Sequence, residues 1–185
     1  MKTLLIDNGS TLTAKLAELS PGNEIVVEHG NIPENLNEFS LIILSGSSKF
    51  PVNGNESLFA KEIELIRTTS IPIVGICFGH ELIAHAFGGD IVYLGQQYKG
   101  MSDITVTEKH EMFGDKKDFT VYENHQYGIV TVPPELKALA VSENSIAVFK
   151  HTSRPIYGFQ FHPEYLMEQQ FGDEIFLSLF RELTS

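Results

Sequence analysis

The sequence has a single cysteine, few basic residues and no long uninterrupted apolar run. One cysteine, Cys77, excludes an internal disulfide and is typical of proteins kept in a reducing compartment. The 13 lysines and arginines are outnumbered by 24 aspartates and glutamates, which gives a net charge of −11. That balance argues against nucleic acid as the main partner, because contact with phosphates requires clustered lysine and arginine.

Signals for membranes and nucleotides are also missing. The longest apolar region, residues 71–89, is interrupted by proline, histidine and glutamate, so it is unsuited to cross a bilayer. The N-terminal apolar run is too short for a secretory signal. Neither a Walker A loop nor a Gly-x-Gly-x-x-Gly fingerprint occurs, so we expect no nucleotide site in this chain. These absences predict a cytoplasmic protein that binds neither membrane nor nucleic acid.

The first half of the chain alternates apolar strands with helices. We expect strands at residues 3–6, 24–28, 41–44 and 71–76, and helices that end at Leu19, span 56–68 and follow Cys77. Ser10 or Thr11 is expected to cap the first helix. This alternation is typical of a parallel sheet with helices on both faces and a ligand site at the carboxyl ends of its strands.

The second half reads as a series of short strands. They are expected at residues 91–94, 104–107, 119–122, 128–132, 137–141, 146–150 and 156–161, and a helix follows at about 170–183. Such a run favours an antiparallel or mixed extension of the sheet. We therefore predict one α/β domain over residues 1–185, with a flavodoxin-like parallel or mixed central sheet, helices on both faces and an antiparallel extension in the C-terminal half.

Cys77 lies between an apolar strand and a helix, in the frame Gly75-x-Cys77-x-Gly79. This pattern predicts a sharp strand-to-helix turn like a nucleophile elbow, with sulfur in place of the usual serine oxygen. Glycine at both flanking positions avoids the clash that a Cβ would cause there. The start of the helix also favours the thiolate form of the side chain. The alternative is that Cys77 is a small buried hydrophobe, as lone cysteines often are.

A second group of polar residues, His162-Pro163-Glu164, follows the strand at residues 156–161. A thiol nucleophile needs an imidazole to take its proton and later to protonate the leaving amine. A carboxylate two residues beyond the histidine can hold the correct tautomer of the ring. Alone, these residues could form an ordinary loop after a strand. Combined with the elbow, they predict catalytic roles for Cys77, His162 and Glu164.

With these residues the chain resembles the class I (triad) glutamine amidotransferases. The resemblance covers nearly the whole chain and depends on residues 75–80, 86–89 and 158–164. Within that family, residues 7–9 and 121–125 are most similar to the glutaminase subunits of archaeal GMP synthases. The resemblance implies that Cys77 forms a γ-glutamyl thioester with glutamine, that His162 is the general acid and base, and that Glu164 orients it.

The same resemblance implies a partner. Ammonia would pass to a separate ATP-dependent synthetase subunit that aminates XMP, and ATP and Mg would bind to that subunit, with no cofactor in this chain. The amide N–H of Phe78 and the loop at Gly46 and Ser47 would stabilise the oxyanion. Segments 97–100 and 124–127 would line the glutamine pocket, and the predicted substrate-binding residues are Glu81, Gln97, Asn124, His125, Gln126 and Tyr127.

Four residues depart from the family pattern. Glu81 replaces a glutamine, Ser47 and Ser48 replace Gly-Pro, and Tyr127 replaces an aspartate. The alternatives therefore include a free-standing thiol hydrolase of γ-glutamyl peptides, a glutaminase subunit of another amidotransferase, and a non-catalytic binding module. A metal site is not expected, because His80 and His85 are five residues apart and about 140° apart around a helix, whereas zinc helices place two histidines four apart.

Overall fold

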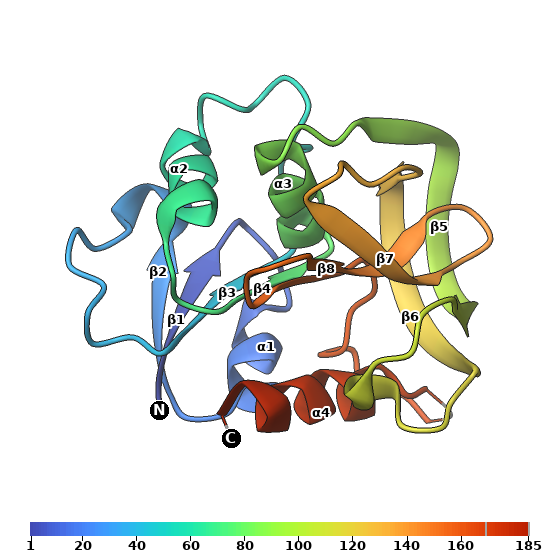
Figure 1. Cartoon of the computed structure of the whole chain (residues 1–185). Coiled ribbons are helices and arrows are strands. Elements are labelled where there is room, and N and C mark those ends of the chain that lie inside the picture. Colours follow the sequence, from blue (N-terminus) through green and yellow to red (C-terminus); the bar gives the residue numbers. More distant parts are fainter. Residues whose placement is uncertain (169, 185) are drawn as a thin grey trace.

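The computed structural model describes residues 1–168 and 170–184, which form a nine-stranded sheet with helices on both faces (Figure 1). The strand order is β2-β1-β3-β4-β9-β8-β7-β5-β6. The strands are β1 (Lys2–Asp7), β2 (Asn23–Glu28), β3 (Leu41–Leu44), β4 (Ile73–Ile76), β5 (Ile91–Val106), β6 (Asp118–Ile129), β7 (Leu136–Val141), β8 (Ile146–His151) and β9 (Ile156–Phe159). The helices are α1 (Thr13–Leu19), α2 (Ala60–Thr68), α3 (Phe78–Ala86) and α4 (Gly172–Thr184), with short 3-10 turns η1 (His29–Asn31) and η2 (Glu111–Phe113).

The first part of the sheet is parallel, as the sequence predicts. Strands β2, β1, β3, β4 and β9 pair in parallel. In β3 every residue is buried, and alternate residues enter two different cores. Leu41 and Ile43 pack in the core that contains α1 and α4 side chains, whereas Ile42 and Leu44 pack in the core under α2 and α3. Helices therefore cover both faces, which explains why β3 and β4 carry no polar residue.

The second part of the sheet is antiparallel. Strands β9, β8, β7, β5 and β6 pair in that order, and β5 with β6 forms a long hairpin at the edge (Figure 1). The sequence predicted two short strands within each of these long ones, and that prediction was wrong. Most side chains of β5 between its ends are exposed, so the apolar pattern is lost although the backbone stays extended. The pairing shifts register between Tyr93 and Tyr98, where Gly95 adopts φ +84°.

Several element boundaries also differ from the prediction. Neither Ser10 nor Thr11 caps α1, because Leu12 occupies the N-cap position; the Ser10 hydroxyl instead accepts from the Leu12 N–H at 3.0 Å. Helix α2 begins at Ala60, later than expected. Strand β9 ends at Phe159, so the polar residues that follow it belong to a turn. No helix of the described residues has the length and apolar character to cross a membrane.

Candidate active site

Cys77 occupies a strained turn between β4 and α3. Its φ of 49° makes it the one non-glycine residue with positive φ in the described chain. Glycine is required on both sides: a Cβ at Gly75 would lie 2.5 Å from the backbone of Gly79, and one at Gly79 would overlap the backbone of Leu44. The Cys77 N–H donates to Phe159 O at 2.7 Å, which ties the turn to the neighbouring strand β9. The predicted strand-to-helix elbow is therefore present, and backbone contacts hold it.

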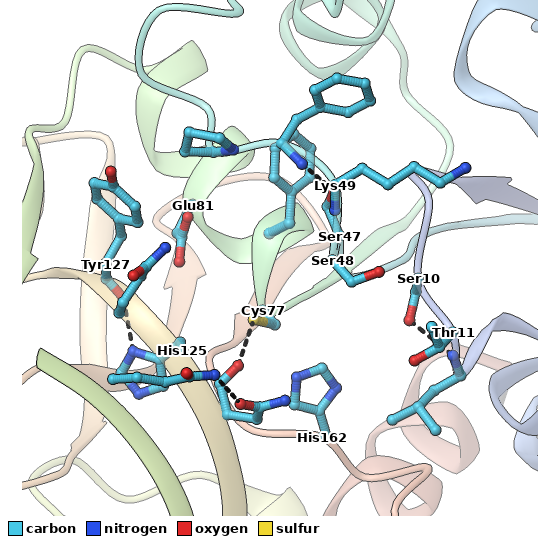
Figure 2. Close-up of a pocket in the computed structure, with 17 residues that line it drawn as sticks. Ser10, Thr11, Ser47, Ser48, Lys49, Cys77, Glu81, His125, Tyr127 and His162 are labelled. Carbon is cyan, nitrogen blue, oxygen red and sulfur yellow. Dashed lines mark hydrogen bonds between the residues drawn. The ribbon is translucent and has the colours of Figure 1, made fainter.

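His162 and Glu164 lie in the turn after β9 and come close to Cys77. Nδ1 of His162 is 2.8 Å from Oε1 of Glu164, and both side chains are buried. The ring also lies beside Cys77 (Figure 2), and the two side chains shift each other's pKa. The structure thus brings the three residues together, although Cys77 and His162 are 85 positions apart in the sequence.

In Cys77 and His162, burial and the interaction between the two side chains shift the pKa in opposite directions. Cys77 and Glu164 raise the pKa of His162 well above its usual value against the effect of burial. Burial raises the pKa of the Cys77 thiol, although His162 acts in the opposite direction. The sequence predicted that the helix start would favour a thiolate, but desolvation outweighs this in the free site because the sulfur is enclosed. Ionisation of Cys77 therefore depends on the transfer of its proton to His162.

A cavity of ≈ 280 Å³ opens above these residues (Figure 2). Its lining comes from the carboxyl ends of the parallel strands and from the β5–β6 hairpin. The lining residues are Ser10, Thr11, Leu12, Ser47, Ser48, Lys49, Phe50, Pro51, Cys77, Phe78, Glu81, Gln97, Asn124, His125, Gln126, Tyr127 and His162. The site is therefore open to a small molecule at the edge where parallel sheets commonly bind ligands.

Most of the predicted site residues meet at this cavity. Gly46 lies just outside the lining, where a Cβ would come within 3.2 Å of His162 Cε1 and 3.7 Å of Cys77 Cβ. Glu164 lies behind the His162 ring. Residues 98–100, which were expected to line the pocket, do not reach it. The Tyr98 ring instead lies 6.1 Å from that of His125, centre to centre.

Asn124, His125, Gln126 and Tyr127 belong to β6, where the sequence predicted a gap between two strands. Gln97 Nε2 donates to Asn124 Oδ1 at 2.8 Å across the hairpin. Nδ1 of His125 is 2.7 Å from Tyr127 O, which fixes the ring against its own strand. The carbonyl of Asn124 also accepts from Cys77 Sγ at 3.9 Å. Pairing between β5 and β6 therefore builds this wall of the cavity.

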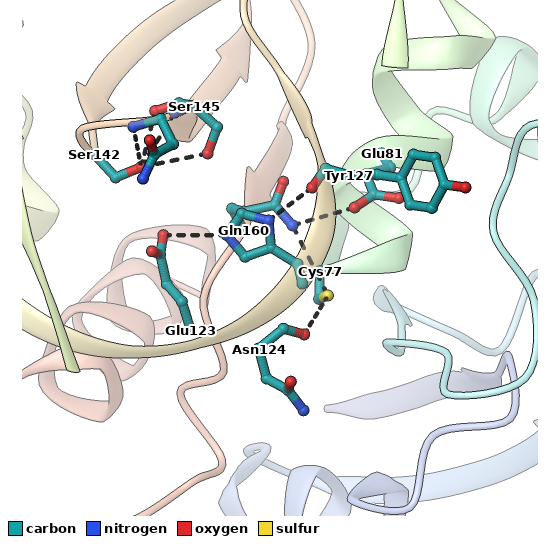
Figure 3. Close-up of polar contacts among 10 residues, drawn as sticks. Cys77, Glu81, Glu123, Asn124, Tyr127, Ser142, Ser145 and Gln160 are labelled. Atoms are coloured by element: carbon teal, nitrogen blue, oxygen red, sulfur yellow. Dashed lines mark hydrogen bonds and ion pairs between the residues drawn. The ribbon is translucent and has the colours of Figure 1, made fainter. Parts of the chain in front are cut away.

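Gln160 is a site residue that the sequence analysis missed. Its Nε2 lies 3.8 Å from Cys77 Sγ and 3.3 Å from Glu81 Oε1, so one amide group joins the sulfur to the carboxylate (Figure 3). Burial raises the pKa of Glu81 to about 7. The position of its amide between Phe159 and Phe161, which the structure shows to be fully buried, could have indicated this role. A polar side chain at a buried position needs hydrogen-bond partners.

His80 on α3 lies in the core and does not line the cavity. His80 is fully buried with its ring 4.4 Å from that of Phe149, and burial lowers its pKa to about 3. It is a neutral core residue that faces away from solvent. Over the ranges 1–168 and 170–184, no group of three or more His, Cys, Asp or Glu residues is placed to hold a metal ion.

Comparison with known proteins gives consistent results. Residues 4–181 match the family model "Glutamine amidotransferase class-I". The glutamine-hydrolyzing GMP synthase subunit of Archaeoglobus fulgidus is 30% identical over 153 residues, or 82% of this chain and 80% of that protein. The corresponding GMP synthase subunit of Pyrococcus abyssi is 37% identical over 136 residues, or 72% and 70% of the two chains.

A solved structure has the same fold. The crystal structure of a candidate GMP synthase subunit from Thermoplasma acidophilum superposes with a TM-score of 0.88 at 26% identity. The match covers 100% of this chain and 94% of that one. The family model, the relatives and this structural likeness together show that the chain belongs to the class I glutamine amidotransferase family.

Proposed function

We propose that this glutamine amidotransferase hydrolyses the side-chain amide of L-glutamine through a thioester on Cys77. The observation that carries the proposal is the buried contact chain Cys77–His162–Glu164 at the floor of an open cavity. A thiol, an imidazole and an orienting carboxylate in that order are the parts that nucleophilic amide cleavage requires.

The first chemical step joins Cys77 Sγ to the amide carbon of the substrate. The thiol proton goes to His162 as the sulfur attacks, and His162 then gives a proton to the leaving nitrogen, so ammonia departs and a γ-glutamyl thioester remains. Glu164 keeps the proton of Nδ1 in place and offsets the positive charge of the ring. Water, deprotonated by His162, then attacks the thioester carbon and releases glutamate and the thiol.

Each attack places negative charge on the carbonyl oxygen. The Phe78 N–H stands in the first turn of α3, where backbone donors lack partners within the helix. The loop of residues 45–48 borders Cys77 and His162 and can supply a second donor from Ser47. Each such donor lowers the barrier by about 3 kcal/mol. We assign these two amides to the oxyanion.

We further propose that the ammonia serves a separate synthetase subunit in the cytoplasm, and that this subunit is the ATP-dependent half of a GMP synthase that aminates XMP. The printed names of the Archaeoglobus and Pyrococcus relatives support this partner. In this arrangement ATP and Mg bind to the partner, and this chain holds no cofactor.

The test is ammonia release from glutamine by the purified chain, alone and with a GMP synthase ATP-pyrophosphatase subunit, XMP and Mg-ATP. We expect release to rise on addition of the partner and GMP to form, and we expect none from Cys77→Ala. An electrophilic diazoketone analogue of glutamine should modify Cys77. If Cys77 remains unmodified and no mixture releases ammonia, the proposal is wrong.

A second candidate is a free-standing thiol hydrolase of γ-glutamyl peptides. The buried carboxylate of Glu81 in the cavity favours it, since the chain differs there from the family pattern. The discriminating measurement is the ratio of kcat/KM for γ-glutamyl dipeptides to that for glutamine, without a partner subunit. A ratio above one would favour the hydrolase.

A further inference from the structure

Glu62 is a buried carboxyl group with no charged partner among the described residues. It lies on α2 and is fully shielded from solvent, and its neighbours along the chain Phe59, Ile63 and Ile66 belong to an apolar core. Burial raises its pKa to about 8, and a hydrogen bond from Asn8 opposes this only in part. A buried carboxyl group without a counter-ion costs stability, so its presence calls for a role beyond packing.

Asn8 connects Glu62 to the loop of residues 45–48. Its Nδ2 donates to Glu62 Oε2 at 3.2 Å and to Ser45 O at 3.4 Å, and its backbone N–H donates to Ser45 Oγ at 2.9 Å. All three residues are fully buried. The remaining oxygens of the two joined groups, Asn8 Oδ1 and Glu62 Oε1, have no hydrogen-bond partner within the described chain. Both are acceptors, and only a proton on Glu62 would supply a donor at one of them.

Ser45 connects Asn8 to the backbone of the loop. Its hydroxyl donates to Gly46 O at 2.8 Å, which fixes the direction of the carbonyl in the Gly46–Ser47 peptide. In a trans peptide the N–H points opposite to the C=O, so the Ser47 N–H is directed away from Ser45. The far end of the loop is held as well, because the Ser48 N–H and hydroxyl both donate to Gly9 O, at 3.2 and 2.9 Å.

We propose that Glu62, acting through Asn8 and Ser45, is a positioning residue that sets the orientation of the Gly46–Ser47 peptide beside Cys77 and His162. The inference rests on the proposed function in that the Ser47 N–H is taken as an oxyanion donor. Ionisation of Glu62 would keep the hydrogen bond from Asn8 Nδ2 but would leave a buried charge without a counter-ion beside it. We therefore expect the loop to be ordered at neutral pH and to relax above about pH 8.

The charges around Glu62 do not provide another explanation. The elements packed against α2 carry His29 on η1 and His80, Glu81 and His85 on α3, and none of these perturbs the pKa of Glu62. Arg154 binds carbonyls at the far end of α2. The carboxylate of Asp7, next to Asn8, accepts from Gly9, Ser10 and Thr13 instead.

Three variants of the full chain test the proposal. Glu62→Gln keeps the shape and offers both a donor and an acceptor to Asn8 at every pH, whereas Glu62→Leu offers neither. Glu64→Gln, at an exposed position of the same helix, is the matched control. The first measurement is amide hydrogen exchange of residues 45–48, and the second is the infrared band of a protonated carboxylic acid in the difference between wild type and Glu62→Gln.

We expect Glu62→Leu to exchange faster at residues 45–48 at pH 7, and Glu62→Gln and Glu64→Gln to match the wild type. Above about pH 8 the wild type should exchange faster than Glu62→Gln at the same pH, and the infrared band should disappear. In glutamine hydrolysis, Glu62→Leu should lower kcat about tenfold with little change in KM, because a misplaced donor affects the transition state more than binding.

Unchanged exchange in Glu62→Leu, or no protonated-acid band in the wild type at pH 7, would overturn the proposal. Should Glu62→Leu fail to fold, the test is amide exchange of residues 45–48 in the wild type and Glu62→Gln from pH 7 to about 9. Identical exchange in the two proteins would then refute the proposal. Exchange and infrared spectra do not depend on turnover. If no mixture releases ammonia and Cys77 stays unmodified, the proposed function is wrong, and exchange and infrared spectra still decide this inference.

Discussion

The two halves of the sheet position their catalytic side chains in different ways. In the parallel half, the backbone itself places Cys77: β4 ends in a turn that only glycine neighbours permit. After β9, the strand where the parallel and antiparallel parts meet, a side-chain pair places the base, since Glu164 holds the ring of His162 at 2.8 Å. The difference predicts that the turn at Cys77 fails when volume is added, whereas the turn at His162 fails when charge or hydrogen bonding is changed.

The largest expected effect is the loss of the folded elbow in Gly79→Ala. The added Cβ would overlap the Leu44 backbone and come within 2.8 Å of the Leu44 Cβ. Because backbone cannot move aside as a side chain can, we expect the free energy of unfolding to fall by about 3 kcal/mol or more. Denaturant unfolding measures the change. Gly30→Ala is the control, since nothing lies within 4 Å of its added Cβ; equal stability of the two variants would contradict the prediction.

The next effect is on the base. His162→Ala should lower the rate of glutamine hydrolysis by about 10⁴-fold, because the thiol then has no proton acceptor and the leaving nitrogen has no donor. Stability should change far less than activity. The measurement is kcat with the partner subunit present, with His85→Ala as control on the neighbouring helix. A loss of only a few-fold would show that another group takes the proton.

Glu164→Gln sharpens the comparison, because it keeps the volume and removes only the charge. The amide can still contact Nδ1 but favours the wrong tautomer, so we expect kcat to fall by about 10²-fold or more with the fold intact. The pKa of His162 should also fall, since Glu164 raises it. A pH titration of the His162 ring by NMR would detect this shift, and an unchanged titration would contradict the assigned role of Glu164.

Glu81→Gln should have the smallest effect. Burial raises the pKa of Glu81 to about 7, and its negative charge raises the pKa of Cys77. As pH rises through 7, the wild-type carboxyl group ionises and opposes formation of the thiolate. Glutamine at this position stays neutral, so alkylation of Cys77 should reach half its maximal rate at a lower pH. Alkylation profiles of both proteins provide the measurement, and a shift to higher pH would show the opposite sign.

The parallel half was predictable to a large extent from the sequence. Its inner strands β3 and β4 are buried on both faces, so short apolar runs mark them with errors of no more than two residues. The long β5–β6 hairpin was not, because the exposed face of β5 carries polar side chains and Gly95 interrupts the pattern. The start of α2 was also misplaced, since the Glu56 carboxylate accepts from the Gly54 N–H and holds a turn before the helix.

The sequence by itself determined the elbow, because glycine spacing and an apolar strand act over a few neighbouring residues. It also marked His162 and Glu164, which are close together on the chain. Only the tertiary structure decided what lies between distant segments: Gln160 beside Glu81, β6 as a wall of the cavity, and Glu62 behind the loop of residues 45–48. Burial and hydrogen-bond partners at these places are set by strand order and helix packing, which no local pattern encodes.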